Sequence, residues 1–358
     1  MVPRPADSKA LPARSRTSKE PAWASWPDKK LLDLRFCDLE LEIDGSALET
    51  RIDQLARELE ELGFRFRPFY WISSEWFTPD GVPGCAAPFY LIHPRLAELE
   101  RSQVREVEGG TAEWCMKILR HEAGHAIDNA YQLRRRRRRQ SLFGSSHTPY
   151  PEFYEPRPYS RSIVRHLEPS YALSHPDEDF AETFAVWMTP HSDWRRRYIA
   201  WPALKKLEYI DELMRKVRDK PPMTTRRTEI EPLGELTTTL REHYATRRER
   251  LGIGEADAYD RDLARLFPRR VDDAGGKGSG SADEFIASIQ PEALTKVARW
   301  TGEYKYTVKR VLAEVRARCR TLRLGVDAAK SDTREDFVLF LTAQTMKYIL
   351  KGRHREWL

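Results

Sequence analysis

The apolar positions of the chain follow two periods, one typical of strands and one typical of helices. Residues 31–43 alternate between apolar and polar side chains, which predicts a strand. Within residues 48–62 the apolar side chains recur at spacings of four and three, so we expect a helix with one buried face. Residues 64–77 and 87–93 are aromatic or apolar and predict further strands. This part of the chain therefore favours a small mixed sheet beside a helix.

Three helices are predicted in the middle of the chain. Thr111 can cap a helix that runs to about Tyr131. Pro176 opens a second helix whose first turn is acidic, as the helix dipole favours, and this helix should end near Pro190. A third helix is expected from about Trp201 and ends before a Pro-Pro pair.

The rest of the chain is helical in pattern, apart from a segment of small residues (DDAGGKGSGSAD) that has the composition of a flexible linker. We expect the polar, basic N-terminus to be disordered. The predicted fold class is α+β, mainly helical with a small mixed sheet. The predicted parts are a lead-in (1–30), a main domain (31–222), a helical extension (223–271), a linker (272–283) and a helical C-terminal region (284–358).

Composition places the chain among globular proteins with a heavily solvated surface, since 40% of residues are hydrophobic and 32% are charged. No stretch approaches the roughly 18 to 20 apolar residues of a membrane-spanning helix, and the N-terminus lacks the apolar middle of a secretory signal. The four cysteines form no CxxC pair, so neither a zinc knuckle nor a disulfide framework is indicated. We therefore expect a cytoplasmic protein.

The net charge of +6 is modest, and much of it is local. Six consecutive arginines extend from Arg134 to Arg139. Such a run can contact nucleic acid, an anionic membrane surface or an acidic substrate. Because six like charges repel one another in any compact element, we expect instead a solvated loop just beyond a helix.

The residues HEAGH, at positions 121–125, carry the strongest chemical signal. His121 and His125 are four residues apart, so on a helix both imidazoles lie on one face and can reach one tetrahedral zinc ion. The intervening Glu122 can face the water bound to that ion. A chance match, with two histidines that only pack, is the alternative, and a third ligand is needed to distinguish the two.

Catalytic zinc takes three protein ligands and leaves one position for water. A third histidine close behind His125, as in HExxHxxGxxH, is absent. The later acidic helix offers Glu178, with Glu182 four residues on and on the same face. We expect Glu178 to bind the metal and Glu182 or Asp128 to hydrogen-bond the second nitrogen of a ligand histidine. Without a metal, the two glutamates are helix-start carboxylates and Asp128 only solvates a helix end.

Together with HEAGHAID, the stretch SYALSHPDEDFAETFAVWM (170–188) resembles the gluzincin peptidases, in particular the lethal-factor-type catalytic domains and a group of zinc-binding metallopeptidases. The resemblance covers roughly residues 111–215. It implies a zincin-like catalytic domain within 31–222, Zn²⁺ as the cofactor, and a glutamate ligand in the pattern E-x-F-A-E. It also implies a catalytic tyrosine seven residues before that glutamate, which is Tyr171 here. The alternative for Tyr171 is a core aromatic.

These residues predict a zinc-dependent metallopeptidase. Zinc held by His121, His125 and Glu178 would lower the pKa of its water, and Glu122 would take the proton as the water attacks a peptide carbonyl. Through the resemblance, Tyr171 would donate a hydrogen bond to the developing oxyanion. The expected substrate is a peptide or protein, acidic if the cleft lies near the arginine run.

The alternative is a binding or regulatory protein with an inactive, peptidase-like zinc site that contacts nucleic acid or a partner through basic patches. Such charges are usually only a solvated face. Against this alternative stands Glu122, which a structural zinc site does not need. The sequence leaves the substrate and the oligomeric state open. The basic residues of the C-terminal helices are Lys305, Lys309, Arg310, Arg316, Arg318, Arg320 and Arg323.

Overall fold

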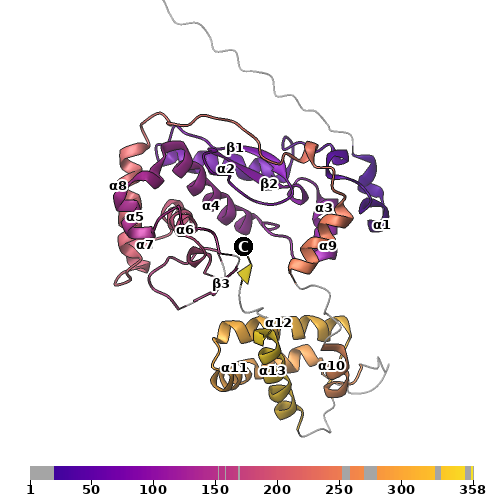
Figure 1. Ribbon diagram of the computed structural model, residues 1–358. Coiled ribbons are helices and arrows are strands. Elements are labelled where there is room, and N and C mark those ends of the chain that lie inside the picture. Colours follow the sequence, from indigo (N-terminus) through magenta and orange to yellow (C-terminus); the bar gives the residue numbers. More distant parts are fainter. Residues whose placement is uncertain are drawn as a thin grey trace, which may run out of the picture.

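The protein is mainly helical with a small sheet (Figure 1), so the predicted α+β class is confirmed. The computed structural model describes residues 20–151, 153–157, 159–167, 170–251, 259–269, 280–326, 332–350 and 356–357. The helices are α1 (Asp28–Leu31), α2 (Ala47–Glu61), α3 (Pro94–Val104), α4 (Ala112–Tyr131), α5 (Arg137–Phe143), α6 (Pro176–Met188), α7 (Trp194–Arg197), α8 (Leu204–Val217), α9 (Leu240–Arg250), α10 (Asp260–Leu266), α11 (Ala282–Thr301), α12 (Lys305–Thr321) and α13 (Thr333–Leu350). The strands are β1 (Phe69–Ser73), β2 (Gly84–Pro88), β3 (Phe153–Tyr154) and β4 (Glu356–Trp357).

Helix α4 carries HEAGH through the interior and has the predicted bounds. The Thr111 hydroxyl caps it by accepting a hydrogen bond from the backbone N–H of Trp114. Glu113 lies in the first turn, where the helix dipole favours a negative charge. Every residue of α4 from His121 to Tyr131 is buried. The ligand-bearing half of the helix therefore lies inside the protein.

Helix α6 packs closely against α4. It begins at Pro176, as predicted, and the ring of His175 caps it by accepting a hydrogen bond from the backbone N–H of Asp177. Gly124 of α4 lies against Ala181 of α6, and a Cβ atom added to Gly124 would lie 2.9 Å from Ala181 Cα. The missing side chain at position 124 therefore allows the two helices to approach closely.

The main sheet consists of two parallel strands, so the expected mixed sheet is corrected. Phe69 of β1 is opposite Gly84 of β2, and Phe77 adds one antiparallel bridge to Ala86. The strand predicted at residues 64–77 contains β1. The strand predicted at residues 87–93 is misplaced, because β2 ends at Pro88, which has no N–H to donate to a ladder, and a 3-10 turn follows.

The strand predicted at residues 31–43 is wrong. This segment contains the end of α1, a 3-10 turn and a single bridge from Arg35. The Asp38 carboxylate accepts hydrogen bonds from the backbone and the side chain of Arg35, which favours a turn. Phe36 and Leu39 are nevertheless almost fully buried. The alternation of apolar residues thus reflects burial and not strand pairing.

The disorder predicted for residues 1–30 is wrong for the part from residue 20 onward, and residues 1–19 lie outside the described residues. Residues Ala22–Ser25 form a 3-10 turn, and α1 follows. Trp23 is buried, and its indole N–H donates a hydrogen bond to the Leu39 carbonyl at 3.3 Å. A large buried aromatic side chain anchors this segment to the core.

The C-terminal helices α10 to α13 have a hydrophobic core of their own (Figure 1). Its buried members include Phe267, Ile286, Val311 and Phe337, and it shares no residue with the clusters around α2, α3 and α4. Residues 272–279 of the predicted linker (272–283) lie outside the described residues. The predicted end of the linker at residue 283 is corrected, because α11 already begins at Ala282. No described helix combines the length and apolar character needed to cross a bilayer.

Candidate metal centre

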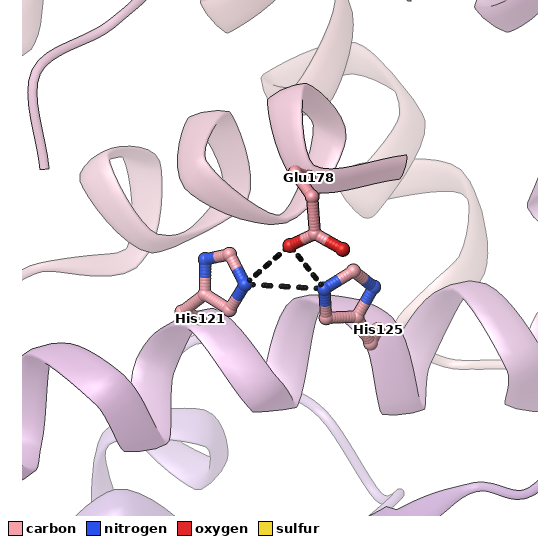
Figure 2. Close-up of side chains that lie close together, drawn as sticks. All are labelled: His121, His125 and Glu178. Carbon is pink, nitrogen blue, oxygen red and sulfur yellow. Dashed lines mark hydrogen bonds and ion pairs between the residues drawn. The ribbon is translucent and has the colours of Figure 1, made fainter. Parts of the chain in front are cut away.

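Three side chains from α4 and α6 converge on one point (Figure 2). Glu178 Oε2 lies 2.9 Å from His121 Nε2 and 3.1 Å from His125 Nε2. The two Nε2 atoms lie 3.1 Å apart. Two imidazoles and one carboxylate within this distance of one another could hold a metal ion. The sequence predicted these three residues as ligands, and the fold brings them together.

The local sequence explains this convergence. The spacing of four residues places His121 and His125 on one face of α4. Glu178 lies in the first turn of α6, where the helix dipole stabilises a carboxylate. Burial alone would raise the pKa of Glu178, but the two neighbouring imidazoles outweigh burial and hold this pKa well below its usual range. Glu178 is therefore an ionised carboxylate.

Glu182 lies where the sequence predicts, behind His121. Its Oε1 atom is 2.9 Å from His121 Nδ1, and its Oε2 atom accepts a hydrogen bond from the backbone N–H of Leu167 at 2.9 Å. Glu182 is fully buried. A carboxylate at Nδ1 orients the ring and leaves Nε2 directed at the centre.

Of the two predicted partners for a ligand histidine, Glu182 takes this role, and Asp128 has other hydrogen-bond partners among the described residues. Its carboxylate accepts hydrogen bonds from the backbone N–H of Arg134 at 2.8 Å and from Arg139 Nη2 at 2.7 Å. Asp128 is fully buried and therefore does not solvate a helix end either. The arginine run that follows α4 folds back on this helix, so that its first and last arginines both contact Asp128.

The arginine run is not a solvated loop. It forms a 3-10 turn and the first residues of α5. Arg139 is fully buried, and Arg134 is half-buried with a hydrogen bond to Asp80 at 2.7 Å. Only Arg135, Arg136, Arg137 and Arg138 are exposed. Repulsion between like charges is overcome at both ends of the run because acidic residues distant in sequence pair with them.

Glu122 lies on α4 beside the two histidines and is buried. Its Oε2 atom accepts a hydrogen bond from the Thr78 hydroxyl at 2.8 Å. Thr78 belongs to the connection between β1 and β2, so the sheet positions it. A buried carboxylate adjacent to a metal site can accept a proton. Thr78 is absent from the sequence prediction, because it lies in an irregular segment with no periodic pattern.

Tyr171 and Tyr150 both reach the centre. The ring centroid of Tyr171 lies 5.5 Å from that of His121. Burial and the charge of Glu178 raise the pKa of Tyr171 well above its usual value, so its hydroxyl keeps its proton. The Tyr150 hydroxyl donates a hydrogen bond to Glu178 Oε1 at 2.7 Å. Tyr150 is absent from the sequence prediction because it also lies in an irregular segment.

Comparison of the chain with protein-family models, with curated proteins and with solved structures finds no match.

Proposed function

We propose that the protein is a zinc-dependent peptidase of the HExxH type. The observation that carries this proposal is the buried group of His121, His125 and Glu178, with a second carboxylate, Glu122, on the adjacent residue of α4. Two imidazoles and one carboxylate form a ligand set typical of catalytic zinc. Glu122 is the feature that favours catalysis, because a structural zinc site has no use for a further carboxylate that does not bind the metal.

Each residue has a separate part in the proposed reaction. A zinc ion in this site supplies Lewis-acid chemistry, which acidifies water and polarises a carbonyl. Glu122 accepts the proton of the attacking water and is held by the Thr78 hydroxyl. The Tyr171 hydroxyl donates a hydrogen bond to the oxyanion that develops on the substrate carbonyl. Glu182 keeps the His121 ring in the orientation that presents Nε2.

We propose a peptide or protein as the substrate, without a preference for acidic sequences. Arg139 and Arg134 at the ends of the run contact Asp128, Asp177 and Asp80, and the four arginines between them are exposed. The run therefore offers no lining of six free charges to a substrate.

The C-terminal helices give little support to the alternative function of nucleic-acid binding. Arg316 and Arg320 pair with Asp283, and Arg318 pairs with Asp260. These charges are partly neutralised within the protein, as in an ordinary solvated helix face.

We propose a cytoplasmic location for the protein. The cysteines Cys37, Cys85, Cys115 and Cys319 are all free, which is usual in a reducing compartment.

The proposal is tested by zinc content and peptide hydrolysis of three variants of the full chain. Glu178→Ala removes a ligand and should abolish stoichiometric zinc. Glu122→Gln should retain zinc and lose on the order of 10²- to 10⁴-fold in kcat, because the general base is gone. Glu113→Gln changes an exposed glutamate on the same helix and should behave like the wild type. Normal hydrolysis by Glu122→Gln would show that the catalytic assignment is wrong.

A further inference from the structure

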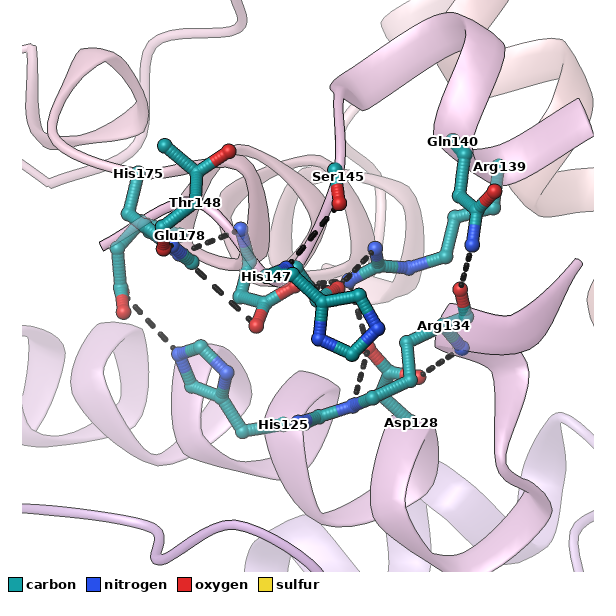
Figure 3. A network of polar contacts seen from close by, with 12 residues as sticks. His125, Asp128, Arg134, Arg139, Gln140, Ser145, His147, Thr148, His175 and Glu178 are labelled. Carbon is teal, nitrogen blue, oxygen red and sulfur yellow. Dashed lines mark hydrogen bonds and ion pairs between the residues drawn. The ribbon is translucent and has the colours of Figure 1, made fainter. Parts of the chain in front are cut away.

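Arg139 is a fully buried cation that joins both ligand-bearing helices (Figure 3). Its Nη2 atom lies 2.7 Å from Asp128 Oδ2 on α4 and 2.6 Å from Asp177 Oδ1 on α6. Asp128 follows His125 by three residues, and Asp177 directly precedes Glu178. One guanidinium group therefore connects points next to two of the three candidate ligands.

This contact constrains the separation of the helices. A buried charge is tolerated only when it is paired, and removal of one partner leaves the others uncompensated. Asp128 and Asp177 would repel each other as carboxylates, and Arg139, which pairs with both, offsets this repulsion. The planar guanidinium also lies over the Phe180 ring of α6, at 4.7 Å from its centroid. A planar guanidinium that bridges two carboxylates and lies over an aromatic ring fixes geometry better than a point charge does.

The same residue anchors the segment that follows α5. Arg139 Nη1 donates a hydrogen bond to Ser146 Oγ at 2.8 Å, and the Ser146 hydroxyl donates to Asp177 Oδ1 at 2.5 Å. Beyond this anchor, Tyr150 stacks on His175 and donates its hydrogen bond to Glu178. Arg139 thus contacts all three parts of the chain that contribute side chains to the centre, namely α4, α6 and this segment.

We propose that Arg139 is a positioning residue of the metal centre, which holds α4 and α6 at the separation where His121, His125 and Glu178 meet. The inference rests on the proposed function for the identity of the metal. It is tested by zinc affinity and by amide hydrogen exchange of the metal-free protein, and not by catalytic activity. Arg139 would thus have a structural role inside the protein, unlike the four exposed arginines that precede it.

Two variants of the full chain separate positioning from simple stabilisation. Arg139→Met leaves two buried carboxylates unpaired and should lower both stability and zinc affinity. A triple variant, Arg139→Met with Asp128→Asn and Asp177→Asn, removes all three charges, so much of the stability should return. Zinc affinity, measured by competition with a chromophoric chelator, should stay roughly 10- to 100-fold below wild type in both variants. Arg137→Met, at an exposed position of the same run, is the matched control and should keep wild-type affinity.

A triple variant that regains wild-type zinc affinity would overturn the proposal, because Arg139 would then act only through stability. Hydrogen exchange of the metal-free protein tests the role of Arg139 even if the wild type binds no zinc. Absence of zinc binding by the wild type would count against the proposed function and not against this role of Arg139. Amides at Asp177–Phe180 should exchange faster in both variants than in the wild type, while those of α12 in the separate C-terminal core stay unchanged. Unchanged exchange at Asp177–Phe180 would also overturn the proposal.

Discussion

His121 lies between two carboxylates, with Glu178 at Nε2 and Glu182 at Nδ1. Burial alone would lower the pKa of His121, but the two carboxylates outweigh burial and raise this pKa well above its usual value. The pKa of His125 is also raised, because Glu178 outweighs burial there. A protonated imidazole cannot bind a metal, so protons and zinc compete for the same nitrogen atoms.

Zinc binding to the metal-free protein at pH 7 should release protons, and zinc affinity should rise with pH. Because the folded-state pKa of His121 is raised, the imidazolium stabilises the metal-free fold below the unfolded pKa of about 6.5. This stabilisation is lost as the pH rises through the folded value. Calorimetric titrations in two buffers of different ionisation enthalpy measure the release. Equal binding enthalpies in both buffers would contradict the prediction.

The two tyrosines should differ in what their removal changes. Tyr171→Phe is expected to lower kcat by roughly 10²- to 10³-fold with zinc affinity unchanged, because its hydroxyl acts on the substrate oxyanion. Tyr150→Phe should weaken zinc affinity by about 10-fold, because its hydroxyl holds a ligand carboxylate. Kinetics and chelator competition on both variants provide the comparison. Loss of zinc affinity in Tyr171→Phe would assign that residue to metal binding instead.

Sequence spacing was sufficient for the parts of the centre that lie on helices. His121, His125, Glu178 and Glu182 obey the helical period, so their common faces follow from position alone. Thr78 and Tyr150 lie in irregular segments, where side-chain direction depends on the whole fold. Asp128 obeys the helical period too, yet its partner is Arg139, which no local pattern reveals.

At the scale of elements, the close approach of α4 and α6 decides where the ligands meet. Gly124 allows this approach, since its Cβ would lie 2.9 Å from Ala181 Cα and 3.2 Å from Phe184 Cδ1. The strand predictions failed at the same scale. Alternating apolar residues indicate a buried face, but they do not provide a neighbouring strand. In residues 31–43 the apolar side chains are buried from helical turns instead.

Gly124→Ala should therefore destabilise the protein and weaken zinc binding. The added methyl group meets backbone atoms that cannot move aside, and overpacking of this kind costs about 1–3 kcal/mol. Denaturant unfolding of the metal-free variant and chelator competition measure the two effects. Gly234→Ala, where a Cβ atom meets nothing within 4 Å, is the control and should change neither quantity. Wild-type values for both quantities in Gly124→Ala would show that the helices are not limited by this contact.

At the scale of the whole molecule, two sets of hydrophobic clusters are separate. The C-terminal cluster lies within residues 259–348, and the clusters around the metal centre lie within residues 23–244. Described contacts between the two parts include the pairing of β3 with β4 and a ring contact between Tyr159 and Tyr304. The composition of the chain indicated a division of this kind, but the sequence could not show which core the segment 20–30 joins.

A chain that ends at Leu251 should fold and bind zinc with affinity close to that of the full chain, because it retains every buried member of the clusters around α4. Thermal unfolding by circular dichroism and zinc stoichiometry measure this. An insoluble product or loss of zinc would show that the part with the candidate metal centre requires the C-terminal helices.

The arginine run gives a final consequence for how this chain tolerates sequence change. Six identical neighbours look interchangeable, yet Arg139 is sealed in the interior while the four before it are exposed to solvent. Deletion of any one of the six arginines leaves five arginines before Gln140, but it shortens by one residue the connection between Asp128 on α4 and the arginine at the end of the run. Such a deletion would therefore disturb the contacts of that arginine with Asp128 and Asp177, even though every remaining residue of the run is an arginine.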